Sequence, residues 1–209
     1  MKKSVSQNNW LRRQSNDYYF NLAKKEKYRS RAAYKLIEIN KKYKLISYSS
    51  RIIDLGCSPG SWSQVAISNI NKKTNEVTSI DIKKMDPLSN CNFILDDIER
   101  LLNKKNCFLK FNSYNLILSD MAPNASGHKF TDQAKSEKLS FLALKFSYQY
   151  LSDKGNFVCK LFRGGSEKVF IEEAIVKFKK VHLFKPLSSR KESKEIYAIC
   201  LGFNNLQLP

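Results

Sequence analysis

The sequence holds few of the side chains that bind metals or form disulfides. Its 209 residues include two histidines, and its five cysteines are scattered, with no Cys-x-x-Cys pair among them. An odd number of scattered cysteines indicates neither a disulfide framework nor a zinc site. Two separate histidines do not make a metal centre without several carboxylates. The composition therefore predicts a reduced protein without a metal.

Long apolar runs are absent as well. No stretch approaches the ~20 apolar residues that a membrane-spanning helix needs. The N-terminus, which begins Met1-Lys2-Lys3, lacks the apolar segment of a secretory signal. These absences predict an intracellular protein, cytoplasmic or mitochondrial, that is neither secreted nor bound to a membrane.

Acidic residues are outnumbered almost two to one. The chain has 19 Asp and Glu against 37 Lys and Arg, which gives a formal net charge of +18. The excess is concentrated in the first fifty residues, where thirteen basic residues stand against three acidic ones. Such a charge favours a polyanionic partner, with nucleic acid before an acidic protein surface or an anionic membrane.

Short apolar runs alternate with amphipathic stretches from residue 30 onward. The expected strands are residues 51–55, 77–82, 92–95, 114–119, 157–162, 181–184 and 196–201. The expected helices are residues 30–44, 62–70, 133–151 and 167–178. This alternation predicts an α/β fold, with a mostly parallel sheet and helices on both faces. Because only the short loop 185–195 joins the last two strands, we expect them to form an antiparallel hairpin at one edge.

A chain of this length holds one α/β domain. Residues 1–29 are polar and basic with scattered aromatics, and we expect them to form a basic N-terminal arm with a short helix. Residues 30–209 are expected to form the domain itself.

The first strand ends in a turn with two glycines. The segment reads Asp54-Leu55-Gly56-Cys57-Ser58-Pro59-Gly60-Ser61-Trp62, and glycines in such a turn let a ligand approach the backbone closely. It matches neither the dinucleotide fingerprint nor a Walker loop. Asp81 closes the next strand, 21 residues after Gly60, about the offset of a carboxylate that binds ribose hydroxyls. A ribose carboxylate without a phosphate-binding lysine suits a nucleoside ligand that lacks a pyrophosphate, such as S-adenosylmethionine.

Further motifs occur along nearly the whole chain. They are residues 10–14 (WLRRQ), 30–36 (SRAAYKL), 54–62 (DLGCSPGSW), 81–82 (DI), 85–87 (MDP), 119–124 (SDMAPN), 158–162 (VCKLF) and 185–197 (KPLSSRKESKEIY). In this order they resemble the FtsJ or RrmJ family, the ribosomal RNA large-subunit 2′-O-methyltransferases of bacterial and mitochondrial type. The resemblance implies a Rossmann-like class I methyltransferase fold with a seven-stranded sheet, and S-adenosylmethionine as cofactor. It also implies methyl transfer to a ribose 2′-hydroxyl, that of a uridine in large-subunit ribosomal RNA, by a protein that we expect to be a monomer.

Four charged residues stand beside or within apolar segments. Lys35 lies on the apolar face of the first expected helix, and Asp120 follows an apolar strand. Lys160 lies within an apolar run, and Glu195 opens the last strand. Each alone fits an ordinary role, as a lysine that extends to water or a carboxylate that caps a turn. The FtsJ family has a Lys-Asp-Lys-Glu tetrad at these motif positions, so the resemblance implies that these four residues form the catalytic set.

The chemistry explains why such residues are wanted. A ribose hydroxyl attacks a sulfonium methyl group readily only once its proton is drawn away. Burial and a neighbouring ammonium lower the pKa of a lysine, whereas nearby carboxylates raise it. Our hypothesis is that Lys160 accepts the proton. Asp120 and Lys35 position this lysine and the attacking oxygen, and Glu195 anchors the set.

The resemblance also implies which residues bind the cofactor. They are Asp54, Gly56, Gly60, Trp62, Asp81, Asp97 and Asp120. Trp62 fits a core aromatic at the start of a helix equally well. Because Asp96 stands beside Asp97, that assignment can shift by one residue.

Basic residues interleaved with aromatics can neutralise phosphates and stack on bases. We expect such RNA contacts from the N-terminal segment and from the loop before the last strand. The candidates are Arg12, Arg13, Arg29, Arg31, Arg190, Lys191 and Lys194. The expected partner is ribosomal RNA or the large ribosomal subunit.

Two other functions fit parts of the sequence. Related enzymes methylate the 2′-hydroxyl of tRNA or of an mRNA cap, and the segment Leu161-Phe162-Arg163-Gly164 is similar to the tRNA enzymes. A non-catalytic RNA-binding ribosome assembly factor would need neither the tetrad nor the glycine turn. The motif at residues 10–14 and the compact length favour the ribosomal enzymes.

Overall fold

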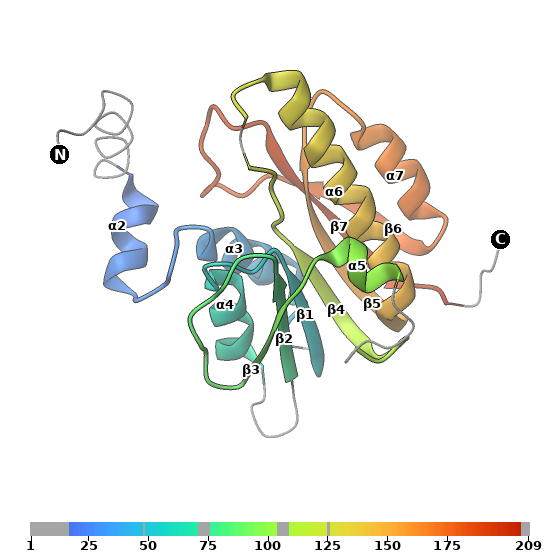
Figure 1. Cartoon of the computed structure of the whole chain (residues 1–209), viewed down its shortest axis with the longest axis horizontal. Helices are drawn as coiled ribbons and strands as arrows, with labels where there is room; N and C mark the ends of the chain where they lie inside the picture. The colour runs from blue at the N-terminus through green and yellow to red at the C-terminus, as the bar shows by residue number, and fades with distance from the viewer. Residues whose placement is uncertain (1–16, 48, 71–75, 104–108, 125, 206–209) are drawn as a thin grey trace.

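A single seven-stranded sheet runs through the protein (Figure 1). Its strands are β1 (Arg51–Leu55), β2 (Glu76–Asp81), β3 (Cys91–Leu95), β4 (Tyr114–Ser119), β5 (Leu151–Phe162), β6 (Phe178–Phe184) and β7 (Glu195–Phe203). Their order across the sheet is β3-β2-β1-β4-β5-β7-β6. Adjacent strands from β3 through β2, β1 and β4 to β5 are parallel, whereas β7 is antiparallel to both β5 and β6. The expected α/β fold with an antiparallel hairpin at one edge is confirmed.

The structure is a computed structural model that describes residues 17–47, 49–70, 76–103, 109–124 and 126–205. The motif at residues 10–14, with the expected RNA contacts at Arg12 and Arg13, lies outside these ranges.

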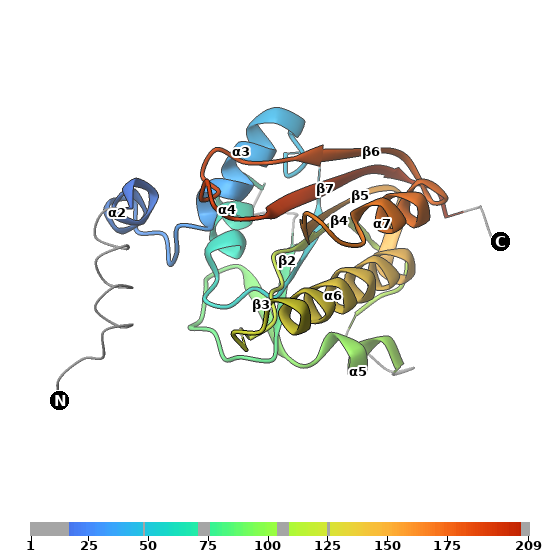
Figure 2. The same ribbon diagram turned by 90° about the horizontal axis from the view of Figure 1, so that it is seen from above.

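Helices cover both faces of the sheet. They are α2 (Tyr18–Lys25), α3 (Ala33–Tyr43), α4 (Ser61–Asn69), α5 (Ile98–Asn103), α6 (Lys129–Tyr150) and α7 (Glu167–Ile175). Figure 2 shows α3 and α4 on one face, and α5, α6 and α7 on the other. Helix α2 precedes both layers and lies beside the body of the molecule (Figure 1).

The core is divided by the sheet into two layers of buried side chains. Successive strand residues point to opposite faces, so Ile52 packs with α3 and α4 whereas Ile53 packs on the α6 side. Leu116 and Ile117 in β4 divide in the same way. Because both faces are covered, the central strands are apolar on both sides, which explains the uninterrupted apolar runs in the sequence.

Several element boundaries differ from the expected ones. Helix α6 begins at Lys129 rather than at residue 133, because the Asp132 carboxylate accepts hydrogen bonds from Ser126 and Gly127 and closes the turn before the helix. Helix α7 ends at Ile175 rather than at residue 178, since Phe178 is buried in the core as the first residue of β6. These boundaries depend on contacts with other segments, which periodicity does not show.

Candidate functional site

The carboxyl ends of β1, β2 and β4 border a cavity of about 520 Å³. Here the strand order changes direction, from β1 to β2 on one side and from β1 to β4 on the other. Ligands of open α/β sheets bind at such a switch point. Of the residues expected to bind the cofactor, four line this cavity: Gly56, Asp81, Asp97 and Asp120.

Both glycines of the turn after β1 occupy positions that a side chain would not fit. Gly56 has φ +71°, and a Cβ there would lie 2.5 Å from the Met121 Cγ. Gly60 has φ +109°, and its Cβ would lie 2.7 Å from both an Arg29 nitrogen and the Met85 sulfur. The turn is therefore packed from both sides, with Gly56 on the cavity wall and Gly60 behind it at the start of α4.

Asp81 is held in place at the end of β2 by two backbone groups. The Ser58 amide donates to its Oδ2 at 2.9 Å, and the Lys83 amide donates to its Oδ1 at 2.8 Å. Each carboxylate oxygen has a second lone pair. Asp81 lines the cavity, so its carboxylate is positioned to accept hydrogen bonds from the hydroxyls of a ribose.

Asp96 and Asp97 both line the same cavity. The Asp96 Oδ1 forms an ion pair with Arg100, whereas the Asp97 Oδ1 accepts a hydrogen bond from the Glu99 amide at 2.8 Å at the start of α5. The structure therefore places both neighbours at the site, and the choice of Asp97 stays a prediction.

Three other residues expected to bind the cofactor lie away from the cavity lining. Gly60 is one of them, as described above. The Trp62 side chain is buried, donates from its indole Nε1 to the Ala32 carbonyl at 2.8 Å, and packs against Tyr197 with ring centroids 5.6 Å apart. Its surroundings are those of a core aromatic. Asp54 lies inside the fold, where its Oδ2 accepts a hydrogen bond from Ser63 at 2.6 Å.

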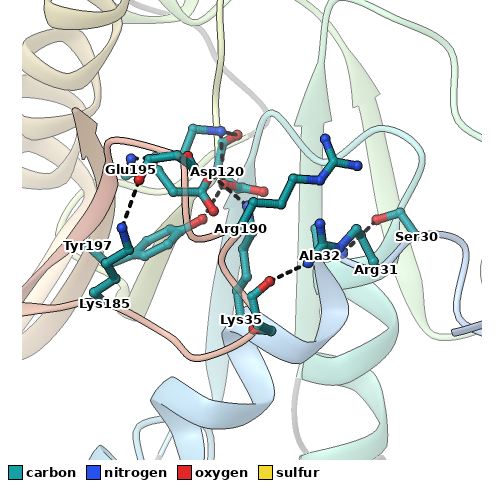
Figure 3. Close-up of polar contacts among 12 residues, drawn as sticks. Ser30, Arg31, Ala32, Lys35, Asp120, Lys185, Arg190, Glu195 and Tyr197 are labelled. Atoms are coloured by element: carbon teal, nitrogen blue, oxygen red, sulfur yellow. Dashed lines mark hydrogen bonds and ion pairs between the residues drawn. The ribbon is translucent and has the colours of Figure 1, made fainter. Parts of the chain in front are cut away.

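The four residues expected to form the catalytic set lie in two ion pairs, and Asp120 of this set also lines the cavity. Figure 3 shows Lys35, Asp120 and Glu195 together with Tyr197. The Lys160 Nζ lies 3.0 Å from the Asp120 Oδ1 and also donates to the Asp120 main-chain oxygen at 2.9 Å. The Lys35 Nζ lies 2.9 Å from the Glu195 Oε2. Lys35 is on helix α3 and Asp120 directly follows β4. Lys160 is on β5 and Glu195 is on β7. Residues separated by up to 160 positions in the chain are thus brought together.

Tyr197, which was not among the expected site residues, joins the two ion pairs. Its hydroxyl donates to the Asp120 Oδ1 at 2.7 Å, and the Lys35 Nζ lies 5.9 Å from its ring centroid. Tyr197 is directly opposite Lys160 in the pairing of β5 with β7. A signal was present, because Tyr197 is two residues after Glu195 in a strand and therefore shares its face.

Asp120 is the carboxylate on which these contacts converge. Burial raises its pKa, but the positive charges of Lys160 and Lys35 and the hydrogen bonds from Tyr197 and Lys160 outweigh that effect. The pKa of Asp120 is therefore held below its ordinary value, and the group is ionised at neutral pH. An ionised Asp120 can fix the direction of the Lys160 amine.

The basic residues expected to contact RNA have different surroundings. The Arg29 guanidinium donates to the main-chain oxygens of Pro59, Asp86 and Pro87 at 2.9, 2.7 and 2.9 Å. Arg31 and Arg190 share one partner, the Asp17 carboxylate, at 2.8 and 3.6 Å. Lys191 and Lys194 are exposed. The RNA-binding role of all five stays a prediction.

The described ranges hold neither a metal-binding group of side chains nor a membrane-spanning helix. No group of three or more His, Cys, Asp and Glu residues is arranged to hold a metal ion in that part of the chain. No helix there is both long and apolar enough to cross a membrane.

Several known proteins are similar to this chain in sequence. The family described as FtsJ-like methyltransferase matches residues 28–203. Ribosomal RNA large subunit methyltransferase E of Anaplasma phagocytophilum is 44% identical over 96% of this chain and 83% of its own length. The protein of the same name from Rickettsia canadensis is 42% identical over 96% of this chain and 91% of its own length.

Solved structures agree with this assignment. A ribosomal RNA methyltransferase structure from Plasmodium falciparum is 32% identical, has a TM-score of 0.70, and covers 84% of this chain and 98% of its own. Human methyltransferase-like protein 13, solved with SAH, is 13% identical with a TM-score of 0.53, over 85% of this chain and 82% of its own, and shares the fold alone. Since the family match spans most of the chain, this protein belongs to the FtsJ-like methyltransferase family.

Proposed function

We propose that this methyltransferase transfers the methyl group of S-adenosylmethionine to a ribose 2′-hydroxyl of RNA, and that its substrate is a uridine of large-subunit ribosomal RNA. The observation that carries the proposal is the pairing of Lys160 with Asp120 and of Lys35 with Glu195 at the edge of the 520 Å³ cavity. The names of the relatives, which refer to large-subunit ribosomal RNA, support the choice of substrate.

The cavity residues fit S-adenosylmethionine. Gly56 is on the cavity wall, so a ligand there lies beside the turn after β1, and Asp81 offers acceptors for the two hydroxyls of a ribose. When bound, S-adenosylmethionine supplies an electrophilic methyl group on a sulfonium. Asp120 borders both this cavity and the catalytic set, so methyl donor and attacking oxygen meet at the end of β4.

Methylation of a hydroxyl releases one proton, which Lys160 accepts in this proposal. To accept this proton Lys160 must be a neutral amine, which has two N–H bonds and one lone pair. The two N–H bonds donate to the side chain and main chain of Asp120. The lone pair is left for the proton of the 2′-hydroxyl, and Lys160 becomes an ammonium in this step. Tyr197 and Asp120 hold the amine in this direction. The charge of Lys35 acts on Asp120, and in this proposal the Lys35–Glu195 pair orients the attacking oxygen.

The test is methyl transfer from tritiated S-adenosylmethionine to large ribosomal subunits that lack the modification, to free ribosomal RNA and to tRNA. We expect label in the subunits or ribosomal RNA. It should be recovered in alkali-resistant dinucleotides, because a 2′-O-methyl group blocks alkaline cleavage of the chain. Label in tRNA alone would favour the tRNA enzymes, and label in alkali-sensitive nucleotides would contradict a 2′-O-methyltransferase. No label in any RNA would leave the non-catalytic assembly factor.

A further inference from the structure

A second cavity, of about 460 Å³, lies beside the catalytic set. Its volume is in the range of small-molecule sites. It is lined by Ala122, Pro123, Asp132, Gln133, Phe162, Arg163, Ser193 and Lys194. Ala122 and Pro123 also line the 520 Å³ cavity, so this short segment after Asp120 separates the two spaces.

We propose that this second cavity receives the base of the target nucleotide, extruded from the RNA stack, and that Gln133 selects uracil there. The inference rests on the proposed function, because it assigns the substrate side of the same site. Enzymes that extrude a target nucleotide from the stack hold its base in a pocket of the protein, so an extruded nucleotide here needs such a pocket beside the reacting ribose.

The position of the cavity follows from the chemistry of a ribose. The 2′-hydroxyl is on C2′, and the base is on the neighbouring C1′, so the base must lie within one sugar ring of the reacting oxygen. Phe162 is two residues beyond Lys160 in β5, and Lys194 directly precedes Glu195. Phe162 and Glu195 are also directly opposite each other in the pairing of β5 with β7. The cavity therefore lies next to the catalytic set, where the base of the target nucleotide would lie.

Gln133 lines this space and has an amide oxygen that is free to accept a hydrogen bond. Its amide nitrogen donates to the Gly164 main-chain oxygen at 3.0 Å and to Glu137 at 3.3 Å, so both N–H bonds are used. The amide oxygen, which no described residue contacts as a donor, can accept from the N3–H of uracil. Cytosine has an acceptor at N3 and would place two acceptors against each other, which is unfavourable.

A carboxylate, that of Asp132, also lines the cavity. Its Oδ1 accepts two hydrogen bonds, from the amide and hydroxyl of Ser126, and its Oδ2 accepts one from the Gly127 amide. These bonds direct the carboxylate toward the turn before α6.

The rim of the cavity is basic. Arg163 and Lys194 are both exposed, and their backbones are joined by the hydrogen bond from the Arg163 amide to the Lys194 carbonyl at 2.9 Å. Two neighbouring cations at this cavity can neutralise phosphates that flank an extruded nucleotide. Phe162, half-buried in the wall, offers a ring against which a base can stack.

The test uses the full chain and large ribosomal subunits whose mapped target position carries either uridine or cytidine. We expect wild-type protein to methylate the uridine subunits with a kcat/KM at least about tenfold higher. Gln133→Met should lower kcat/KM for the uridine subunits about tenfold and bring the uridine-to-cytidine ratio close to one. The KM for S-adenosylmethionine should stay unchanged.

The matched control is Gln149→Met, which replaces a second glutamine of α6 that lies outside both cavities. It should behave like wild type. Arg163→Ala, at an exposed position, should weaken subunit binding. The slope of log affinity against log salt concentration should fall by about one, the contribution of one phosphate contact. The uridine preference should stay as in wild type.

A Gln133→Met enzyme that keeps the wild-type uridine-to-cytidine ratio would overturn the inference, as would a wild-type enzyme that methylates both subunits equally. If Gln133→Met does not fold, an Arg163→Ala variant with wild-type subunit affinity and salt dependence overturns it as well. Failure of the proposed function would look different, because the wild-type protein would then label no ribosomal RNA at all.

Discussion

Asp120 connects the two halves of the catalytic set. Its carboxylate accepts hydrogen bonds from Lys160 and Tyr197, and its main-chain oxygen accepts a second one from Lys160. Lys35 acts on it through its charge. Because Asp120 also borders the 520 Å³ cavity, a small displacement of this residue would misalign the lysine and the methyl donor together.

The first residue-scale prediction concerns Lys160. Lys160→Ala should lower kcat by at least about a hundredfold, because the group that accepts the proton is lost. Affinity for S-adenosylmethionine, measured by calorimetry, should stay close to wild type, since Lys160 does not line the 520 Å³ cavity. Lys145→Ala, an exposed lysine of α6, serves as the control. Strong residual turnover in Lys160→Ala would refute the role of this amine.

A second prediction concerns the buried carboxyl group of Asp54. Burial raises its pKa to about 7, helped by the negative charges of Asp120 and Asp81 and opposed by the hydrogen bond from Ser63. Its Oδ1 has no hydrogen-bond partner among the described residues. A group with a raised pKa binds its proton more tightly in the folded than in the unfolded chain, so its contribution to stability falls as the pH rises from about 4 to about 7. Ionising Asp54 inside the fold therefore costs about 4 kcal/mol at most.

Asp54→Asn removes this titration while keeping an acceptor for Ser63. The free energy of unfolding, measured in urea at pH 5 and pH 8, should fall more over this interval for wild type than for Asp54→Asn. All other carboxylates contribute equally to both proteins. Parallel pH profiles would show that Asp54 is not the titrating group.

Individual site residues could be predicted from the sequence only where they belong to a motif. The tetrad was expected and its four members do meet, but the central place of Tyr197 depends on the register of β5 against β7. Trp62 had two equally good interpretations, and its contacts with Ala32 and Tyr197 favour the core aromatic. Neither register nor burial is visible in a single sequence.

At the level of elements, Arg29 joins two loops beside the 520 Å³ cavity. It donates to Pro59 in the turn after β1 and to Asp86 and Pro87 after β2. Hydrogen bonds from a charged donor are each worth about 1.5–3 kcal/mol. The guanidinium therefore stabilises the relative position of these loops.

Arg29→Ala should raise the KM for S-adenosylmethionine about tenfold or more, because the Gly60 turn loses its support. Arg29→Lys should rescue only part of the loss, since one ammonium cannot reach three carbonyls in this geometry. Filter binding to ribosomal subunits distinguishes the two roles. If Arg29 instead contacts RNA, subunit affinity falls and the cofactor KM stays as in wild type.

All seven expected strands are present in the sheet, because short apolar runs bounded by turn residues indicate buried strands well. Helix α5 was missed, since its six residues contain only two buried side chains, Ile98 and Leu101. Strand β5 begins at Leu151, six residues before the expected start, with Asp153 and Lys154 exposed in it. Polar residues in this part of the strand concealed its pairing.

At the scale of the whole molecule, the positive charge is the property that bears on RNA. If about six of the expected basic residues neutralise phosphates, affinity for ribosomal subunits should fall about a thousandfold between 50 and 200 mM salt. The measurement is the slope of log affinity against log salt concentration. A shallow slope, of about one or less, would contradict an extended phosphate-binding surface. Asp17 already pairs with Arg31 and Arg190, so these two arginines must exchange a carboxylate for a phosphate.

The place of β7 has a consequence for how the protein is made. It lies between β5 and β6 although it follows both in the chain, and its nine residues include Glu195 and Tyr197. A ribosome therefore releases β6 into solution before its neighbour exists, and insertion of β7 completes the sheet and the catalytic set in a single late step. A message that stops before codon 195 yields a chain with two open strand edges, prone to aggregation and proteolysis, and no partly active product accumulates.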